Sequence, residues 1–146
     1  MKSLFDPTTY QETKIRIQAL QPDSTARWGK MTVGQMVTHC QFPLKVALSE
    51  KTRKAKWNPI MRLFKKSLYN DKPWRKNLPT APEAKITDTR DLDVEREKLL
   101  SMIGAFYNKR EQQEWQPHPM FGHFTHEQWG QLEYKHLDYH LSQFGV

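Results

Sequence analysis

Three histidines are the residues of this chain whose types and spacing best suit metal chemistry. His136 and His140 stand four positions apart, and His39 lies about a hundred residues earlier. On a helix, a spacing of four places two side chains on one face, with Cβ atoms about 5–6 Å apart. Two neutral imidazoles in that arrangement can share one divalent ion, and a third from a facing helix would complete the site. Such a site keeps one coordination position open for water or substrate, as a catalytic metal requires.

The residues around the histidine pair predict that both imidazoles point inward. One helical stripe combines them with large apolar side chains: Trp129, Leu132, Glu133, His136, Leu137, His140 and Phe144. A buried imidazole needs either a hydrogen-bond partner or a metal. The residues therefore leave two interpretations open, a metal site or a pair of hydrogen-bonded histidines in a core or groove. His39 can join the pair if its helix and theirs are neighbours, which the spacing does not establish.

Two further residues are candidates for catalysis. Glu133 precedes His136 by one turn on the same stripe, so it could orient a ligand imidazole or act as a base on metal-bound water. The alternative is a partly exposed helix acid. His118, in the run HPMFG at 118–122, could line the mouth of a pocket or belong to a rigid loop that docks through its aromatic residues. Cys40 points about 100° away from His39 on a helix, so we interpret it as a small buried hydrophobe.

Ligand type alone does not choose the metal, because histidine suits zinc, nickel, iron and copper. We expect zinc or nickel first, with iron or manganese as alternatives. His126, in the first turn of the last predicted helix, is expected to be solvated.

Four helical patterns would position these residues. They cover residues 7–20, 32–49, 91–109 and 125–144, and Asp6 and the Thr125–Gln128 pair provide N-terminal capping signals. Pro43 falls inside the second pattern and should kink it. Four amphipathic helices in 146 residues predict a single all-α domain, a four-helix bundle over residues 1–146. A long crossover over residues 51–90 separates the second and third helices, with an amphipathic helix from Trp57 to Leu68 followed by a proline-rich extended stretch.

Composition limits the class of protein. The chain is 37% hydrophobic with a mean hydropathy of −0.85, and no window approaches the roughly 18 apolar residues of a membrane span. The first residues contain no apolar run typical of a secretory signal. A single cysteine, Cys40, excludes an internal disulfide. We therefore expect a cytoplasmic protein.

The net charge of +7 is concentrated in residues 51–76, which contain ten basic residues and one acid, Asp71. This segment could bind nucleic acid or an anionic membrane surface. An amphipathic helix that covers the bundle with solvated lysines has the same pattern. We favour that second interpretation, so neither nucleic acid nor a membrane is an expected partner.

Four motifs in order give the chain a family resemblance. RWGKMTVGQMVTHC at 27–40, DKPWRKNLPTAPE at 71–83, HPMFG at 118–122 and WGQLEYKHLDYHLSQFG at 129–145 together resemble the DinB/YfiT-like superfamily. More narrowly, they resemble a branch catalogued only as a domain of unknown function (number 1569). The resemblance implies a bundle with an up-down-down-up path and a divalent metal held by His39, His136 and His140. It also implies that homodimers are common.

Better-studied relatives in the superfamily transfer or isomerise groups with a low-molecular-weight thiol. A thiol at an open metal position ionises at neutral pH. The leading hypothesis is thus a metal-dependent hydrolase or thiol transferase that acts on a small molecule. The alternative is a non-catalytic binding or stress-response module, with a structural or absent metal and contacts to nucleic acid or an anionic surface through residues 51–76.

Overall fold

The structure, a computed structural model, describes residues 1–51 and 59–146, apart from the side chains of 59, 60 and 62. Within these residues the protein is all-helical and contains no β-strand, which confirms the predicted fold class. An isolated antiparallel bridge joins His118 and Gly122. The helices are α1 (Pro7–Ala19), α2 (Val33–Leu48), α3 (Pro59–Lys65), α4 (Leu92–Asn108) and α5 (His126–Gln143), with 3₁₀ turns η1 (Lys66–Leu68) and η2 (Pro82–Ala84).

Local capping chemistry sets where the two site-bearing helices begin. Thr125 and Gln128 form a reciprocal capping box at the start of α5, as their spacing predicts. Thr32 and Gln35 form a second capping box at the start of α2, which the sequence analysis did not identify. Each cap satisfies backbone N–H groups of the first turn and so sets the residue at which its helix begins. Pro43 lies inside α2 without ending it.

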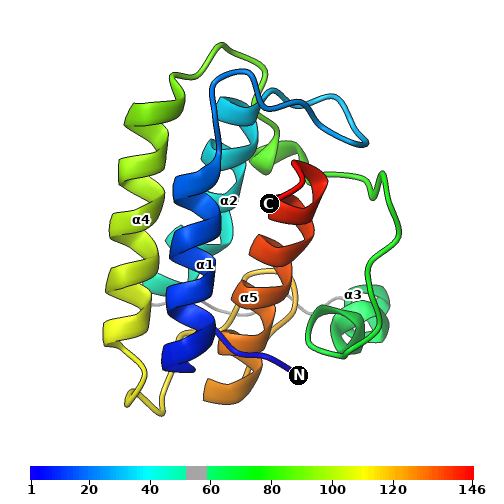
Figure 1. The fold of residues 1–146 in the computed structure, drawn as a ribbon. Coiled ribbons are helices and arrows are strands. Elements are labelled where there is room, and N and C mark those ends of the chain that lie inside the picture. The colour runs from blue at the N-terminus through cyan, green and yellow to red at the C-terminus, as the bar shows by residue number, and fades with distance from the viewer. Residues whose placement is uncertain (52–58) are drawn as a thin grey trace.

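The four long helices lie side by side, and α3 stands apart from them (Figure 1). α2 packs against α4 and α5, and α1 packs against the same two helices. Their shared core consists mainly of aliphatic and aromatic side chains, among them Ile17, Met36, Leu99, Phe106, Trp129 and Leu141. The contact between α2 and α5 supplies the neighbouring helices that a three-histidine site needs. No helix in residues 1–51 and 59–146 is both long and apolar enough to cross a membrane.

The crossover joins α2 to α4 and is helical only in part. The predicted amphipathic helix is represented by α3 and η1, and Trp57 lies outside the described residues. Phe64, which the pattern placed on the apolar side, is 55% exposed, so that side does not cover the bundle along its whole length. The role of the basic residues 51–76 stays a prediction, because residues 52–58 are among those the structure does not describe.

The end of the crossover is fixed against the first turn of α2. A Cβ atom on Gly34 would lie 2.2 Å from the carbonyl oxygen of Arg90, so only glycine permits this approach of the two backbones. Just before this contact, η2 buries Ala84. The crossover therefore returns along α2 close to His39.

Candidate metal centre

The structure brings the three histidines together between α2 and α5. One ligand nitrogen from each of His39, His136 and His140 lies within 4.8 Å of the others. The Nε2 atoms of His39 and His136 are 3.1 Å apart. His39 and His140 are buried, and His136 is partly buried. A single divalent ion could therefore reach all three imidazoles.

Two of the imidazoles are oriented by hydrogen bonds at the far side of the ring. Nδ1 of His39 lies 2.9 Å from the carbonyl oxygen of Ala84, in η2. Nδ1 of His140 lies 2.9 Å from Oε1 of Gln143, one turn later on α5. Since both oxygens only accept, each Nδ1 carries the proton and donates it. The Nε2 lone pairs are then free for the interior of the cluster, as in histidines that bind a metal.

Gln143 is itself held in place by hydrogen bonds to the loop that precedes α2. Its Nε2 donates to the carbonyl oxygen of Trp28 at 2.5 Å, and its backbone carbonyl accepts from Arg27 N at 2.8 Å. Gly29 has a φ of +82°, and a Cβ there would lie 2.6 Å from Nε2 of Gln143. The RWGK stretch thus folds over the end of α5 and positions His140 through Gln143.

The cluster is electrically neutral in the ordinary pH range. Burial lowers the pKa of all three imidazoles, and for His140 the value falls to about 4, with His39 adding to the effect. The pKa of His136 is lowered further by its two histidine neighbours. Neutral imidazoles are the form that binds a metal, so no proton has to leave before a cation enters near pH 7.

The residues fit a divalent ion on their own geometry. For Zn–N bonds of about 2.0–2.1 Å at tetrahedral angles, two ligand nitrogens lie about 3.3 Å apart. The observed 3.1 Å between the Nε2 atoms of His39 and His136 agrees with that spacing. Both imidazoles with a hydrogen-bonded Nδ1 offer Nε2, the expected ligand atom. Three nitrogen ligands would leave a coordination position for a further ligand.

Glu133 is fully buried, which contradicts the alternative of a partly exposed helix acid. Neither carboxylate oxygen has a hydrogen-bond partner among the described residues. Burial raises the pKa of Glu133 to about 8. Cys40 is buried as predicted, and burial together with nearby Glu133 raises the pKa of its thiol. Glu133 is therefore an uncompensated carboxyl group on the helix that carries His136 and His140, and the Cys40 thiol is held in its inert form.

One comparison with known proteins gives a match. The model of the family described as "Protein of unknown function (DUF1569)" matches residues 5–145. The chain belongs to this family. No curated protein and no solved structure matches it.

The second catalytic candidate of this DUF1569 protein lies outside the cluster. His118 is buried against Phe121, Phe124 and Trp129, and its Nδ1 accepts from the backbone N–H groups of Met120 and Phe121 at 3.1 and 3.3 Å. These contacts fit the rigid-loop interpretation, and a catalytic role for His118 stays a prediction.

The expectation of a solvated His126 is wrong. Its ring stacks on Phe5 with centroids 4.2 Å apart, and its Nδ1 bonds to the Gln112 carbonyl. The first turn of α5 is therefore covered by the N-terminal segment of the chain.

Aromatic side chains that the sequence analysis did not assign to the site pack against the cluster of this DUF1569 protein. The ring of Trp74 lies 6.1 Å from that of His136, and the ring of Tyr139 lies 5.0 Å from that of His140, between centroids. Trp74 and Tyr139 also contact each other at 5.6 Å. The DKPWRKN motif could have suggested Trp74, and the step from His136 to Tyr139 on one helix could have suggested Tyr139.

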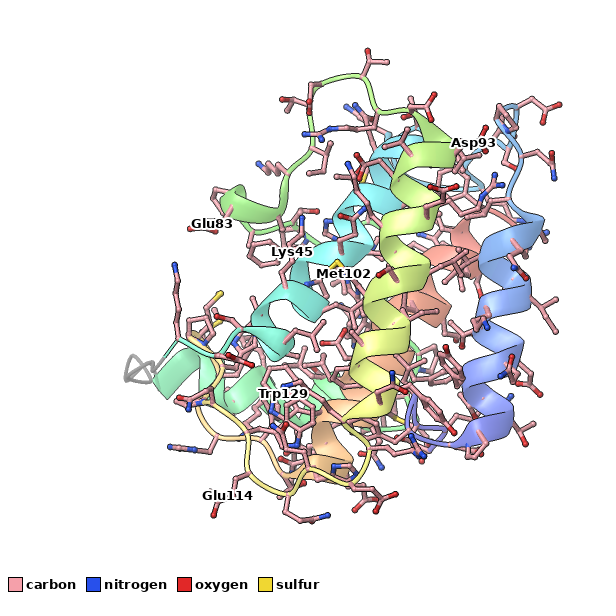
Figure 2. All side chains as sticks on the ribbon, turned by 90° about the vertical axis from the view of Figure 1, so that its left-hand side faces the viewer. Lys45, Glu83, Asp93, Met102, Glu114 and Trp129 are labelled. Carbon is pink, nitrogen blue, oxygen red and sulfur yellow. The ribbon has the colours of Figure 1, made fainter. Side chains whose placement is uncertain are left out.

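In the described part of the chain, one cavity lies beside α2 and another lies beside α5. A cavity of about 770 Å³ lies where α2 meets α4 and the end of the crossover. Lys45, Glu83 and Met102 line it and lie close together in Figure 2. A cavity of about 470 Å³ lies along α5 and is lined in part by Trp74 and Tyr139. The second cavity therefore shares two aromatic residues with the surroundings of the histidine cluster.

Proposed function

We propose that this DUF1569 protein is a metal-dependent enzyme of the DinB-like superfamily. It would hold a divalent ion, zinc or nickel first, with His39, His136 and His140. Hydrolysis or low-molecular-weight-thiol transfer on a small molecule would use the remaining coordination position. The observation that carries the proposal is the convergence of three neutral imidazoles, two of them with Nδ1 fixed by a hydrogen bond.

The path of the chain supports the superfamily part of the proposal. In Figure 1, α1 and α5 run upward and α2 and α4 run downward, with the crossover linking the lower end of α2 to the upper end of α4. This order agrees with the up-down-down-up bundle that the resemblance implies. A single domain over residues 1–146 is part of the same proposal.

The residues of the chain would divide the work as follows. A bound divalent ion would supply Lewis acidity that lowers the pKa of a water or thiol at its open position. Ala84 and Gln143 would keep the imidazoles of His39 and His140 in the orientation that offers Nε2. Glu133, with a pKa of about 8, would take up the proton of the nucleophile on a carboxylate oxygen, since a base works best with a pKa near the operating pH.

Turnover is the test of this proposal. The protein would be stripped of metal, reloaded with zinc or nickel, and assayed on a panel of activated esters and of electrophiles with glutathione, bacillithiol or mycothiol. We expect turnover only in the loaded protein, and none in His136→Ala. The control variant is Lys45→Gln, which changes an exposed lysine at the cavity between α2 and α4, away from the histidines. A loaded protein without a metal-dependent rate on any substrate would contradict the enzyme proposal.

A structural metal is the second candidate, and the low exposure of the cluster favours it. His39 and His140 are each 7% exposed, and Trp74 and Tyr139 pack on the imidazoles. Such a site would be closed to exogenous ligands. In the cobalt-substituted protein, a change of the visible spectrum on addition of imidazole or a thiol would support the open site. An unchanged spectrum would support the structural one.

A further inference from the structure

The cavity along α5 has walls made largely of aromatic rings. It measures about 470 Å³ and is lined by Trp28, Trp74, Tyr134 and Tyr139, the first two from loops and the others from α5. Each of these four side chains is partly buried. A volume of this size accommodates a small organic molecule, and aromatic walls favour a flat one.

The polar atoms of three of these rings are already used within the protein. Nε1 of Trp28 donates to the Tyr139 hydroxyl at 3.2 Å, and that hydroxyl donates to the carbonyl oxygen of Arg75 at 3.2 Å. Nε1 of Trp74 donates to the carbonyl oxygen of Ser67 at 2.8 Å. Because these hydrogen bonds hold the rings in place, what the rings offer to a ligand is their apolar surface.

Most of the charged groups at this cavity are also paired. Asp138 pairs with Arg16 at 2.6 Å, and Asp71 lies 3.4 Å from the amino group of Met1. Lys2 pairs with Glu12 at 2.6 Å. The partners of Asp138 and Asp71 neutralise the two carboxylates that line the cavity, so no unpaired negative charge there would attract a cationic ligand.

The remaining charge at the cavity is positive. Nζ of Lys135 donates to three oxygens of Ser67 and Asn70 at 2.7–2.8 Å, which uses all its protons. Lys72 and Lys76 are exposed, and neither pairs with a carboxylate in the part of the chain that the structure describes. Nζ of Lys76 lies 4.8 Å from the centre of the Trp28 ring. Lys72 and Lys76 both line the cavity together with the aromatic rings, so two positive side chains are available to an anion.

From this arrangement we infer that the cavity binds a small aromatic anion, a carboxylate or sulfonate with a flat ring. The ring would contact Trp28, Trp74 and Tyr139, and the anionic group would lie by Lys72 and Lys76. Trp74 and Tyr139 contact both this cavity and the imidazoles of His136 and His140. The ligand class inferred for the cavity would then be the substrate class of the metal centre. This link to the metal centre rests on the proposed function.

Binding can be measured in the metal-free protein, independently of turnover. The probe is 2-naphthalenesulfonate, titrated by calorimetry and by quenching of tryptophan fluorescence. A ligand of this size in a preformed cavity should bind with a Kd of about 0.1–1 mM. Neutral 2-naphthalenesulfonamide and non-aromatic cyclohexanesulfonate should each bind at least about fivefold more weakly. The double variant Lys72→Gln/Lys76→Gln should lose about five- to tenfold, because both lysines are exposed and each contributes modestly.

The control is Lys45→Gln, an exposed lysine of the other cavity, which should bind the sulfonate as the unchanged protein does. No binding at 10 mM, or equal binding by the sulfonamide and by the lysine double variant, would overturn the inference. In the cobalt-loaded protein, the sulfonate should also shift the visible spectrum. Binding without a shift would overturn the link to the metal centre. A protein that takes up no metal yet binds the sulfonate would overturn the proposed function and leave the cavity assignment standing.

Discussion

Two glutamates buried in this bundle have opposite surroundings. Glu95, on α4, accepts from Gln41 Nε2 at 2.7 Å and from Lys98 Nζ at 2.8 Å, and Arg90 lies 3.7 Å away. Glu133, on α5, has no hydrogen-bond partner for either oxygen among the residues that the structure describes. Both side chains are buried. The two therefore differ in their partners, and Glu133 also lies deeper in the protein.

The two pKa values move in opposite directions as a result. Burial alone would raise the pKa of Glu95, but hydrogen bonds from Lys98 and Gln41 and the charges of Lys98 and Arg90 outweigh it and lower the pKa. Burial acts without opposition on Glu133 and raises its pKa to about 8. At the α2–α4 contact the buried carboxylate of Glu95 is fully paired and stabilises the fold. The α2–α5 contact keeps an uncompensated acid and three neutral imidazoles, a pattern typical of functional sites.

The largest expected effect is the loss of zinc affinity when one histidine between α2 and α5 is removed. In His136→Ala we expect the affinity for zinc to fall about a thousandfold, because one of three ligands is removed. Metal content by mass spectrometry and competition with a chelator would measure this on untagged protein. His123→Ala, which removes an exposed histidine, is the matched control. Equal zinc affinity in the two variants would mean that the cluster is not the metal site.

The α2–α4 side should respond in stability and not in metal affinity. Glu95→Ala leaves the buried amide of Gln41 without its carboxylate, so the free energy of unfolding should fall by about 2–3 kcal/mol. Urea unfolding at pH 7 would measure the change. The control is Glu97→Ala, which removes an exposed acid that lines the same α2–α4 cavity as Glu95. It should change the free energy of unfolding by less than about 0.5 kcal/mol. Similar losses in both variants would show that the ion pairs of Glu95 contribute nothing specific.

The sequence predicted the helices of both regions better than it predicted these partners. Periodicity and capping signals placed the long helices within about two residues, and the HxxxH spacing placed His136 and His140 on one face. A helix depends on residues close together in the sequence, so its periodicity can be recognised from the sequence alone. The acceptor of His39 comes from tertiary structure, since Ala84 lies 45 positions away along the chain. Only Gln143, three residues after His140, could have been inferred from the helix itself.

The hydrogen bond from His140 to Gln143 should contribute less than a ligand does. In Gln143→Ala the imidazole loses the acceptor that fixes Nδ1, and the affinity for zinc should fall about 10- to 100-fold. Gln131→Ala, a surface glutamine on the same helix that bonds to Glu127, is the control. Both variants would be titrated with zinc against a chromophoric chelator. Unchanged affinity in Gln143→Ala would show that His140 is oriented without this contact.

The two glutamates should also differ in how stability depends on pH. A folded-state pKa raised from 4.5 to about 8 means that folded Glu133 holds a proton that the unfolded chain has released. Its contribution to stability is complete below about pH 4.5 and is lost as the pH rises toward 8. The histidines act in the opposite sense, because their lowered pKa values make stability rise with pH up to about 6.5.

Glu133→Gln isolates the contribution of this carboxyl group to the pH dependence of stability, since the amide has nearly the same shape and cannot ionise. In the metal-free protein the variant should gain stability relative to the unchanged protein, by on the order of 1 kcal/mol for each pH unit between pH 5 and pH 8. Urea unfolding at several pH values would measure the difference. A bound divalent cation favours the ionised carboxylate, so zinc should reduce that gain. If the difference instead has no pH dependence, Glu133 is ionised and paired inside the fold, and the contrast with Glu95 disappears.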